Sequence, residues 1–351
     1  MRSVLVTGGA GFIGANFIRT LMSSDPNIKI VNLDALTYAG TKENLKDIEE
    51  NEAYTFVEGF VEDMELLGAL FVHHQFDTVV HFAAETHVDR SILEPSAFIT
   101  SNIQGTYAVL EAARTHWKGD LSENRVHLVS TDEVFGSLEA GDVPSKEISV
   151  YQPRSPYAAT KASGDYLGMA YYHTYGLPVT INHGSNTFGP YQYPEKLVPL
   201  VILRCLRGES IPIYGDGQQV RDWLFVQDHC EAVLRILQKG RAGESYNVGG
   251  NNQVTNLQMV ERICAILDQR IPGPGSYRDL ITFVEDRPGH DRRYAVDSSK
   301  MAKILGWSPT FSLEEGLALT VDWYLSHKDW INSAAQHSSY RHWERTQYQN
   351  W

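Results

Sequence analysis

The chain contains few cysteines and no long hydrophobic run. Its three cysteines, Cys205, Cys230 and Cys264, have neither the spacing of a disulfide framework nor that of a metal site. The longest apolar run, residues 197–203, is far too short to span a bilayer, and the strand-like start lacks the hydrophobic region of a signal peptide. The sequence therefore predicts a cytoplasmic protein with no metal, no disulfide and no membrane contact.

Positive charge is also scarce. With 30 Lys and Arg against 43 Asp and Glu, the formal net charge is −13, which argues against nucleic acid or an anionic membrane as a partner. Any anionic ligand must instead be bound by locally placed cations. At 351 residues, 42% hydrophobic and 21% charged, the chain has the composition of a globular protein with one large or two joined domains.

The N-terminal residues show the pattern of a dinucleotide-binding turn. A strand-like run is followed by Gly8, Gly11 and Gly14 and then by a helical pattern. Glycines at this spacing allow a tight turn and a close approach to a pyrophosphate, and the helix N-terminus supplies positive potential. The next strand-like run ends at Asp34, where a carboxylate can bind the adenosine ribose and repel a 2′-phosphate. We therefore predict NAD rather than NADP.

Strand and helix patterns then alternate, as in a doubly wound parallel sheet. Strands are predicted at residues 3–7, 30–33, 55–58, 78–82, 126–129 and 179–182, and helices at 61–75, 99–116 and 157–175. The predicted fold class is α/β, with a parallel Rossmann sheet and a smaller α/β C-terminal substrate domain.

The chain divides into three predicted parts. Residues 1–187 form the NAD-binding Rossmann domain, to which residues 224–248 return. Residues 188–330 form the nucleotide-sugar-binding domain and residues 331–351 a tail, whose last residues, 338–351, are either docked or disordered. The helices at 99–116 and 157–175 are candidates for a homodimer contact, although their apolar faces also suit an ordinary core.

Polar residues follow the strand-like run at 126–129. Thr131, Asp132 and Glu133 come directly after it, at the carboxyl end of a strand, where open α/β sheets bind ligands. A hydroxyl and two carboxylates at this place predict a catalytic site.

A second motif, Tyr157 and Lys161, follows in the sequence. A helix that begins near Ser155 would place the two side chains one turn apart on the same face. An ammonium beside a phenol favours the phenolate, so the sequence predicts that Lys161 lowers the pKa of Tyr157. Such a tyrosine can take a proton from an alcohol.

Together these motifs carry a family resemblance. The glycine turn with Tyr157 and Lys161 is similar to the extended short-chain dehydrogenase/reductase family. The segments 83–91, 130–136, 189–197 and 287–294 resemble the dTDP-glucose 4,6-dehydratases within it, over about residues 1–330. The resemblance implies a lyase that oxidises C4 of dTDP-glucose, eliminates water across C5 and C6, and returns the hydride from NADH to C6, which yields dTDP-4-keto-6-deoxy-glucose.

The resemblance also implies a role for each catalytic residue. Tyr157 takes the O4 proton, Thr131 hydrogen-bonds the same oxygen, and Lys161 holds the nicotinamide ribose. Glu133 removes the C5 proton and Asp132 protonates the departing C6 hydroxyl, which requires a neutral Asp132 and an ionised Glu133.

Two binding sites are implied in the same way. The cofactor site comprises Gly8, Gly11, Phe12, Ile13, Gly14, Asp34, Leu36, Thr37, Phe60, Val61, Phe82, Ala83, Ala84, Thr86, Ser101, Tyr157, Lys161 and Thr187. The site for the nucleotide-diphosphate-sugar comprises Thr86, Thr131, Asn186, Lys196, Leu197, Pro212, Tyr214, Arg221, Asn256, His290 and Arg292. Arginines such as Arg221 and Arg292 or Arg293 suit phosphate oxygens because they can bind them in a bidentate manner.

Some positions depart from the family pattern. The usual lysine after the ribose aspartate is Ala35, and the usual Asp-Ile pair at the adenine is Phe60-Val61, which predicts a less specific hold on the adenine. Residues 183–184 are His-Gly in place of the family's usual Arg-Cys, and residues 187–188 are Thr-Phe in place of its usual Asn-Tyr.

Three alternatives stay open at this stage. A UDP-glucose 4,6-dehydratase would share every motif, because the sequence does not distinguish thymidine from uridine. A nucleotide-sugar 4-epimerase or decarboxylase is disfavoured, because those relatives lack one or both of the two carboxylates. A catalytically silent NAD-binding protein is disfavoured by the intact catalytic set.

Overall fold

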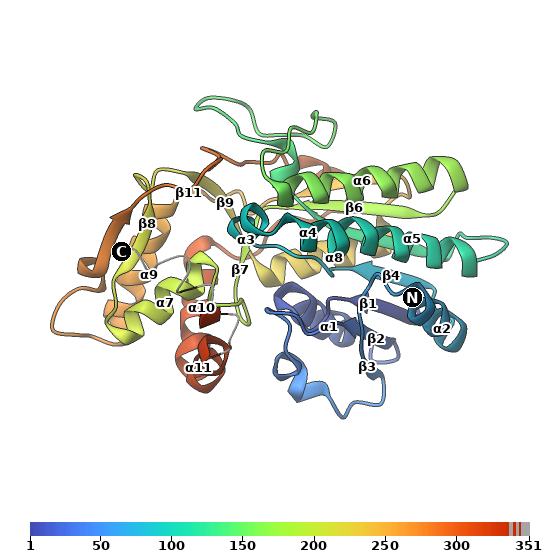
Figure 1. Cartoon of the computed structure of the whole chain (residues 1–351), viewed down its shortest axis with the longest axis horizontal. Coiled ribbons are helices and arrows are strands. Elements are labelled where there is room, and N and C mark those ends of the chain that lie inside the picture. Colours follow the sequence, from blue (N-terminus) through green and yellow to red (C-terminus); the bar gives the residue numbers. More distant parts are fainter. Residues whose placement is uncertain (337–339, 342–343, 345–351) are drawn as a thin grey trace.

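The structure of the protein is a computed structural model that describes residues 1–336, 340, 341 and 344. Seven parallel strands form the main sheet, in the order β10-β6-β5-β4-β1-β2-β3, and confirm the predicted α/β Rossmann architecture (Figure 1). The strands are β1 (Ser3–Thr7), β2 (Lys29–Asp34), β3 (Tyr54–Glu58), β4 (Thr78–His81), β5 (Arg125–Thr131), β6 (Val179–Gly184) and β10 (Glu244–Val248).

Helices cover both faces of this sheet. The side chains of β1 alternate between two cores, with Val4 and Val6 in one and Leu5 in the other, and all three are fully buried. A strand that is buried on both faces reads as a continuous apolar run. One face carries α1 (Phe12–Ser24) and α8 (Val226–Lys239), and the other carries α2 (Met64–His74), α5 (Gly105–His116) and α6 (Pro156–Tyr175).

Helix α6 begins as the sequence predicts. The Ser155 hydroxyl accepts a hydrogen bond from Ala158 N, Pro156 occupies the first turn, and Gly176 ends the helix in a left-handed conformation. These are the standard signals for a helix start and stop. The helix predicted at 99–116 is only partly α-helical, because its first residues form the π-helix η2 (Ile99–Gln104).

The smaller part of the molecule lies on the left in Figure 1. It contains the three-stranded sheet β11-β9-β7 and the two-stranded sheet β12-β8. Its strands and helices are β7 (Asn186–Phe188), β8 (Ile211–Tyr214), β9 (Val220–Phe225), β11 (Gln253–Thr255), β12 (Ile281–Val284), α7 (Leu197–Arg207), α9 (Asn256–Arg270), α10 (Leu313–Ser326) and α11 (Lys328–Gln336). Of the predicted tail, residues 331–336 belong to α11, and most of the rest lies outside the described residues. The three-part division of the chain stays a prediction.

Short helices connect these elements. They are η1 (Lys42–Ile48), α3 (Val88–Leu93), α4 (Pro95–Phe98), η3 (Asp132–Phe135), η4 (Tyr277–Leu280) and η5 (Met301–Leu305). Within the described part of the chain, no helix is long and apolar enough to cross a membrane. The described His, Cys, Asp and Glu side chains form no group of three or more that could hold a metal ion.

Candidate active site

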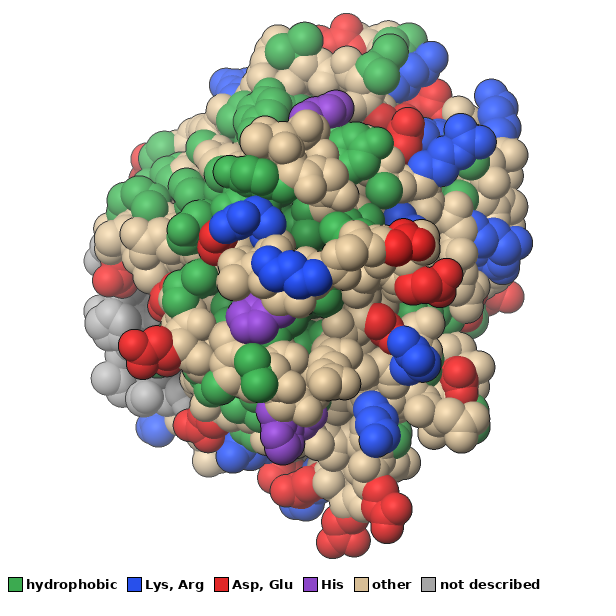
Figure 2. All heavy atoms as spheres, turned by 90° about the vertical axis from the view of Figure 1, so that its right-hand side faces the viewer, with side chains coloured by type: hydrophobic (Ala, Val, Ile, Leu, Met, Phe, Trp, Pro, Cys, Tyr) green, Lys and Arg blue, Asp and Glu red, His purple; other side chains and the backbone are tan. Residues whose placement is uncertain are grey.

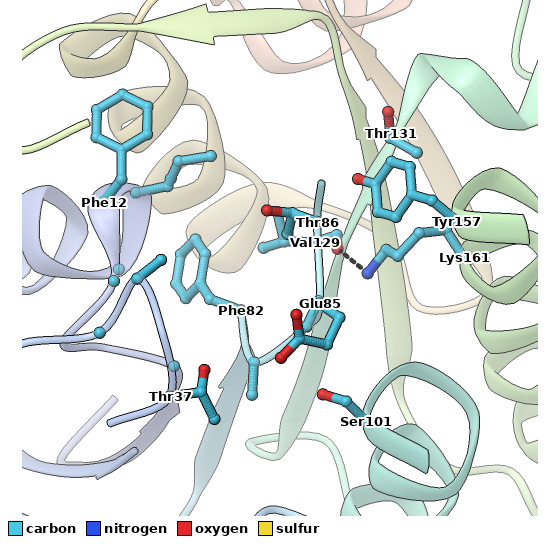
Figure 3. Close-up of a pocket in the computed structure, with 18 of the residues that line it drawn as sticks. Phe12, Thr37, Phe82, Glu85, Thr86, Ser101, Val129, Thr131, Tyr157 and Lys161 are labelled. Carbon is cyan, nitrogen blue, oxygen red and sulfur yellow. Dashed lines mark hydrogen bonds between the residues drawn. The ribbon is translucent and has the colours of Figure 1, made fainter. Parts of the chain in front are cut away.

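A cavity of about 640 Å³ runs from the glycine turn to α6 (Figure 3). It is lined by every residue of the predicted cofactor site except Leu36. It is also lined by Asp132, Glu133 and four residues of the predicted substrate site, Thr86, Thr131, Asn186 and Lys196. The fold thus brings together residues that are far apart in the sequence, at the carboxyl ends of parallel strands.

The glycine turn is shaped for close approach of a ligand. Gly8 has a φ of +71°, and a Cβ there would lie 2.5 Å from Ala83 N. A Cβ on Gly14 would lie 2.4 Å from Gly8 O, so the turn and the start of α1 can meet only without side chains. No side chain caps α1 at Gly11, which leaves the positive end of the helix to a pyrophosphate. These residues fit a dinucleotide.

Asp34 ends β2 beside this turn. Its carboxylate accepts hydrogen bonds from Ala10 N and Leu36 N, both at 2.8 Å. Burial raises the pKa of Asp34, and the two backbone hydrogen bonds oppose the rise. The backbone of Leu36 therefore orients Asp34, whereas its side chain does not line the cavity.

The catalytic candidates come from β5, η3 and α6. The Thr131 hydroxyl caps η3 by accepting a hydrogen bond from Glu133 N at 3.3 Å, and it lies close enough to Tyr157 to lower the pKa of the phenol. Lys161 Nζ donates to Val129 O at 2.8 Å. Figure 3 shows Thr131, Tyr157 and Lys161 together at one end of the cavity.

Asp132 and Glu133 differ in their electrostatic surroundings. Burial, followed by the charge of Glu133, raises the pKa of Asp132 well above its ordinary value. Asp132 is 3% exposed, and its Oδ2 has no hydrogen-bond partner among the described residues. Burial also raises the pKa of Glu133, but three cations, Arg287, Arg221 and Lys196, oppose that rise, and of these Arg221 also acts on Asp132. This asymmetry favours a neutral Asp132 and an ionised Glu133.

The predicted effect of Lys161 on Tyr157 is wrong for the protein alone. Burial, and then the charge of Glu133, raise the pKa of Tyr157 above its ordinary value. Lys161 is bonded to a backbone carbonyl, and burial lowers its own pKa. Desolvation therefore outweighs the attraction of a phenolate for the ammonium.

Seven residues of the predicted substrate site do not line this cavity. Leu197 begins α7, Pro212 and Tyr214 lie in β8, and Asn256 begins α9. The other three contact protein partners. The guanidinium carbon of Arg221 lies 4.4 Å from the centre of the Tyr294 ring. His290 is hydrogen-bonded to Asp286, and Arg292 Nη1 donates to Asp216 Oδ1 at 3.0 Å.

Two residues near the site were given no role by the sequence. Arg287 donates to Asp89 at 2.6 Å and acts electrostatically on Glu133, and the signal for it was its place in the segment 287–294. Glu85 points into the cavity (Figure 3). Burial, with the charge of Glu195, raises the pKa of Glu85 to about 7.

Known proteins resemble this chain over nearly its whole length. A family model described as GDP-mannose 4,6 dehydratase matches residues 5–320. A dTDP-glucose 4,6-dehydratase from Xanthomonas campestris pv. campestris (strain B100) is 52% identical over 97% of this chain and 98% of its own. The dTDP-glucose 4,6-dehydratase 1 of Escherichia coli (strain K12) is 46% identical over 99% of both chains. This chain belongs to the dTDP-glucose 4,6-dehydratase family.

Solved structures agree with this assignment. The dTDP-glucose 4,6-dehydratase of Bacillus anthracis, crystallised in complex with NAD, is 42% identical, with a TM-score of 0.86 over 95% of this chain and 100% of that chain. The UDP-glucose 4-epimerase of Thermotoga maritima, solved with UDP-glucose, is 31% identical, with a TM-score of 0.81 over 92% of this chain and 99% of that chain. The fold is thus common to dehydratases and epimerases, and only the site can separate them.

Two departures from the dTDP-glucose 4,6-dehydratase pattern have a structural setting. Phe60 lines the cavity and is 57% exposed, so it offers an aromatic face where the family resemblance implies a carboxylate. Gly184 lies against His229, because a Cβ on Gly184 would lie 2.6 Å from His229 Cε1. In this family member, His229 therefore occupies the space that a cysteine at 184 would need.

Proposed function

We propose that the protein converts dTDP-glucose into dTDP-4-keto-6-deoxy-glucose and water, with NAD as its bound cofactor. The observation that supports this function best is the shared wall of Thr131, Asp132, Glu133, Tyr157 and Lys161, at one end of a cavity that continues to the glycine turn. When bound, NAD supplies the acceptor of the C4 hydride and later its donor to C6.

The first chemical role belongs to Tyr157. Its phenol oxygen would take the proton from the O4 hydroxyl, with Thr131 as a hydrogen-bond partner of the same oxygen. Because burial disfavours the phenolate in the protein alone, Tyr157 needs the positive charge of Lys161 nearby when it acts as a base.

The elimination requires one acid and one base. The carbonyl formed at C4 acidifies the C5 hydrogen, and Glu133 would remove that proton. Asp132, whose pKa burial raises, would donate its proton to the departing C6 hydroxyl. A carboxylate pair with different protonation states is what such a step needs.

The binding roles divide along the cavity. The glycine turn, Asp34 and Leu36 with the other predicted cofactor residues would hold NAD, and Lys196, which donates to Thr86 O at 2.9 Å, would help to hold the sugar. Arg221, His290 and Arg292 would face the diphosphate and base together with Leu197, Pro212, Tyr214 and Asn256. We add Arg287 to the diphosphate site because its guanidinium is buried near Glu133.

Product analysis tests this function. The purified protein is mixed separately with dTDP-glucose and UDP-glucose, without added reductant, and the products are weighed by mass spectrometry. We expect dTDP-glucose to lose one water with no net NADH. Faster loss of water from UDP-glucose would make uridine the nucleotide. A C4 epimer of unchanged mass would make the protein an epimerase, and NAD binding without turnover would contradict any dehydratase.

We propose that the protein is a homodimer that pairs through residues 99–116 and 157–175. The exposed hydrophobic residues of this region include Ile99, Tyr107, Tyr166 and Tyr175. Figure 2 shows hydrophobic side chains gathered toward the upper left of one face of the molecule, with charged side chains on the right. Large exposed apolar patches commonly mark protein contacts.

A cytoplasmic location is also proposed. All three cysteines are buried and form no disulfide, as in proteins kept in a reducing compartment. We further propose that the protein binds a nucleotide sugar but neither nucleic acid nor a membrane, because its net charge of −13 would repel those anionic surfaces.

A further inference from the structure

A third polar side chain continues the line of Tyr157 and Lys161 along α6. Asp165 lies one turn beyond Lys161, at the same i, i+4 spacing, and is 3% exposed. Ser130 Oγ donates to Asp165 Oδ2 at 2.8 Å, while Lys161 Nζ donates to Val129 O at 2.8 Å. The two side chains of α6 therefore contact consecutive residues of β5, just before Thr131.

Asp165 is itself held by side chains from three other segments. Tyr151 OH donates to Asp165 Oδ2 at 3.2 Å, and His183 Nε2 of β6 lies 3.3 Å from the same oxygen. Asn247 Nδ2 of β10 donates to Ser145 O at 2.9 Å, so Asn247 Oδ1 accepts a hydrogen bond from His183 Nδ1 at 3.1 Å. In a neutral ring His183 Nε2 is then an acceptor, so the single proton of Tyr151 OH is shared between His183 Nε2 at 2.6 Å and Asp165 Oδ2 at 3.2 Å. Hydrogen bonds from Ser130 and Tyr151 hold the Asp165 carboxylate in place.

The buried ammonium group of Lys161 requires a nearby negative charge to stay protonated. Burial lowers the pKa of Lys161, and the charge of Asp165 opposes that change. Tyr157 of α6 and Glu85 lie near Lys161 in Figure 3, and the charge of Lys161 acts on His81 of β4. Burial, with the charge of Lys161, lowers the pKa of His81 to about 3, so His81 is neutral. Without Asp165, the buried Lys161 ammonium would lose the negative charge that opposes the effect of its burial, which is costly.

We propose that Asp165 is a positioning residue for the reaction, which keeps Lys161 charged and holds it beside Tyr157. Asp165 acts through Lys161, because it does not itself line the cavity. This role rests on the proposed dehydration of dTDP-glucose. It assigns a function to the Asp165, Tyr151 and His183 network, which the chemical steps above do not use.

The first test is the pH profile of turnover in NAD-loaded protein. Removal of the Asp165 charge allows Lys161 to lose its proton at a lower pH, so activity should fall on the alkaline side. Relative to wild type, we expect Asp165→Asn to lose on the order of tenfold more activity at about pH 9.5 than at about pH 7. Asp165→Glu, which restores the charge, should recover most of the alkaline activity.

Asp228→Asn is the matched control. Asp228 is also buried, on α8, and accepts hydrogen bonds from Thr310 N and Phe311 N; none of the three lines the cavity. Asp228→Asn should lower the melting temperature and leave the shape of the pH profile unchanged. Should Asp165→Asn fail to fold, Tyr151→Phe serves instead, because it removes one hydrogen bond to Asp165 and should cost about threefold on the alkaline side.

A second readout does not depend on turnover. In protein labelled at the lysine Cε, the NMR resonance of Lys161, assigned with Lys161→Met, should titrate at a lower pH in Asp165→Asn than in wild type. An unchanged titration and an unchanged pH profile, in the folded Asp165→Asn or in Tyr151→Phe, would overturn the role of Asp165. A wild-type protein that releases no water from dTDP-glucose would instead overturn the proposed function, while the NMR titration would still report on Asp165.

Discussion

Two adjacent carboxylates in η3 show how much a single residue's surroundings decide. Three cations, Arg287, Arg221 and Lys196, oppose the rise that burial causes in the pKa of Glu133. The negative charge of Glu133 instead adds to the rise in the pKa of Asp132. The spacing of these residues could be read from the sequence. Their unequal electrostatic surroundings could not, because these depend on which distant cations the fold brings near. For the same reason, neither the effect of Arg287 on Glu133 nor the raised pKa of Tyr157 could be predicted from the sequence.

Replacement of Glu133 by Gln should stop the elimination but not the oxidation. The amide cannot take the C5 proton, so turnover should fall by roughly 10²- to 10⁴-fold while reduced nicotinamide accumulates on the protein. In D₂O, the C5 hydrogen of dTDP-glucose should no longer exchange. Glu139→Gln, at a residue outside the cavity, is the control. Exchange at the wild-type rate in Glu133→Gln would show that Glu133 is not the base.

Replacement of Tyr157 by Phe should block the step before this one. Without the phenol, O4 keeps its proton, so no reduced nicotinamide should appear on mixing with dTDP-glucose, and turnover should fall by at least about 10²-fold. Tyr172→Phe, on the same helix and outside the cavity, is the control. Formation of reduced nicotinamide by Tyr157→Phe at the wild-type rate would assign the base to another residue.

At the scale of secondary structure, elements buried on both faces were the most predictable. Six of the seven strands of the main sheet were found close to their predicted bounds, because parallel strands that are covered on both sides are mostly apolar. The π-helical start of the helix at 99–116 was missed, since hydrophobic periodicity does not report which carbonyl each N–H contacts. The three-residue strands β7 and β11 are too short to show any periodicity.

The strand-turn-helix element around Gly14 should tolerate no side chain. A Cβ on Gly14 would meet the backbone of Gly8 and Gly9 at 2.4 and 2.7 Å, and backbone cannot move aside as a flexible side chain can. We expect Gly14→Ala to lower the free energy of unfolding by about 1–3 kcal/mol, and to weaken NAD binding in calorimetry.

Gly68→Ala provides the comparison for Gly14→Ala. Gly68 is also helical, but a Cβ there would meet its nearest neighbour, His116, at an ordinary 3.8 Å. Alanine is the better helix former, so Gly68→Ala should raise stability by up to about 1 kcal/mol. Equal melting temperatures for the two variants would contradict the close approach at Gly14.

At the scale of the whole molecule, the proposed homodimer can be tested by introducing a charged side chain at the proposed contact and another outside it. Tyr107 on α5 is 46% exposed and Val72 on α2 is 69% exposed. If α5 and α6 pair across a two-fold axis, Tyr107→Arg would bury an unpaired charge and should convert the dimer to monomer in sedimentation velocity. Val72→Arg should leave the dimer intact. A Tyr107→Arg variant that sediments as wild type would place the contact elsewhere.

The strand order of the main sheet has a consequence for synthesis of the chain. β6 has β5 on one side and β10 on the other, yet α7, β8, β9 and α8 all precede β10 in the sequence. While the ribosome makes those elements, β6 remains an open edge that can pair with a wrong strand. Nascent chains that stall before β10 is complete should therefore need a chaperone, even though every residue of the acid and base pair has already been made.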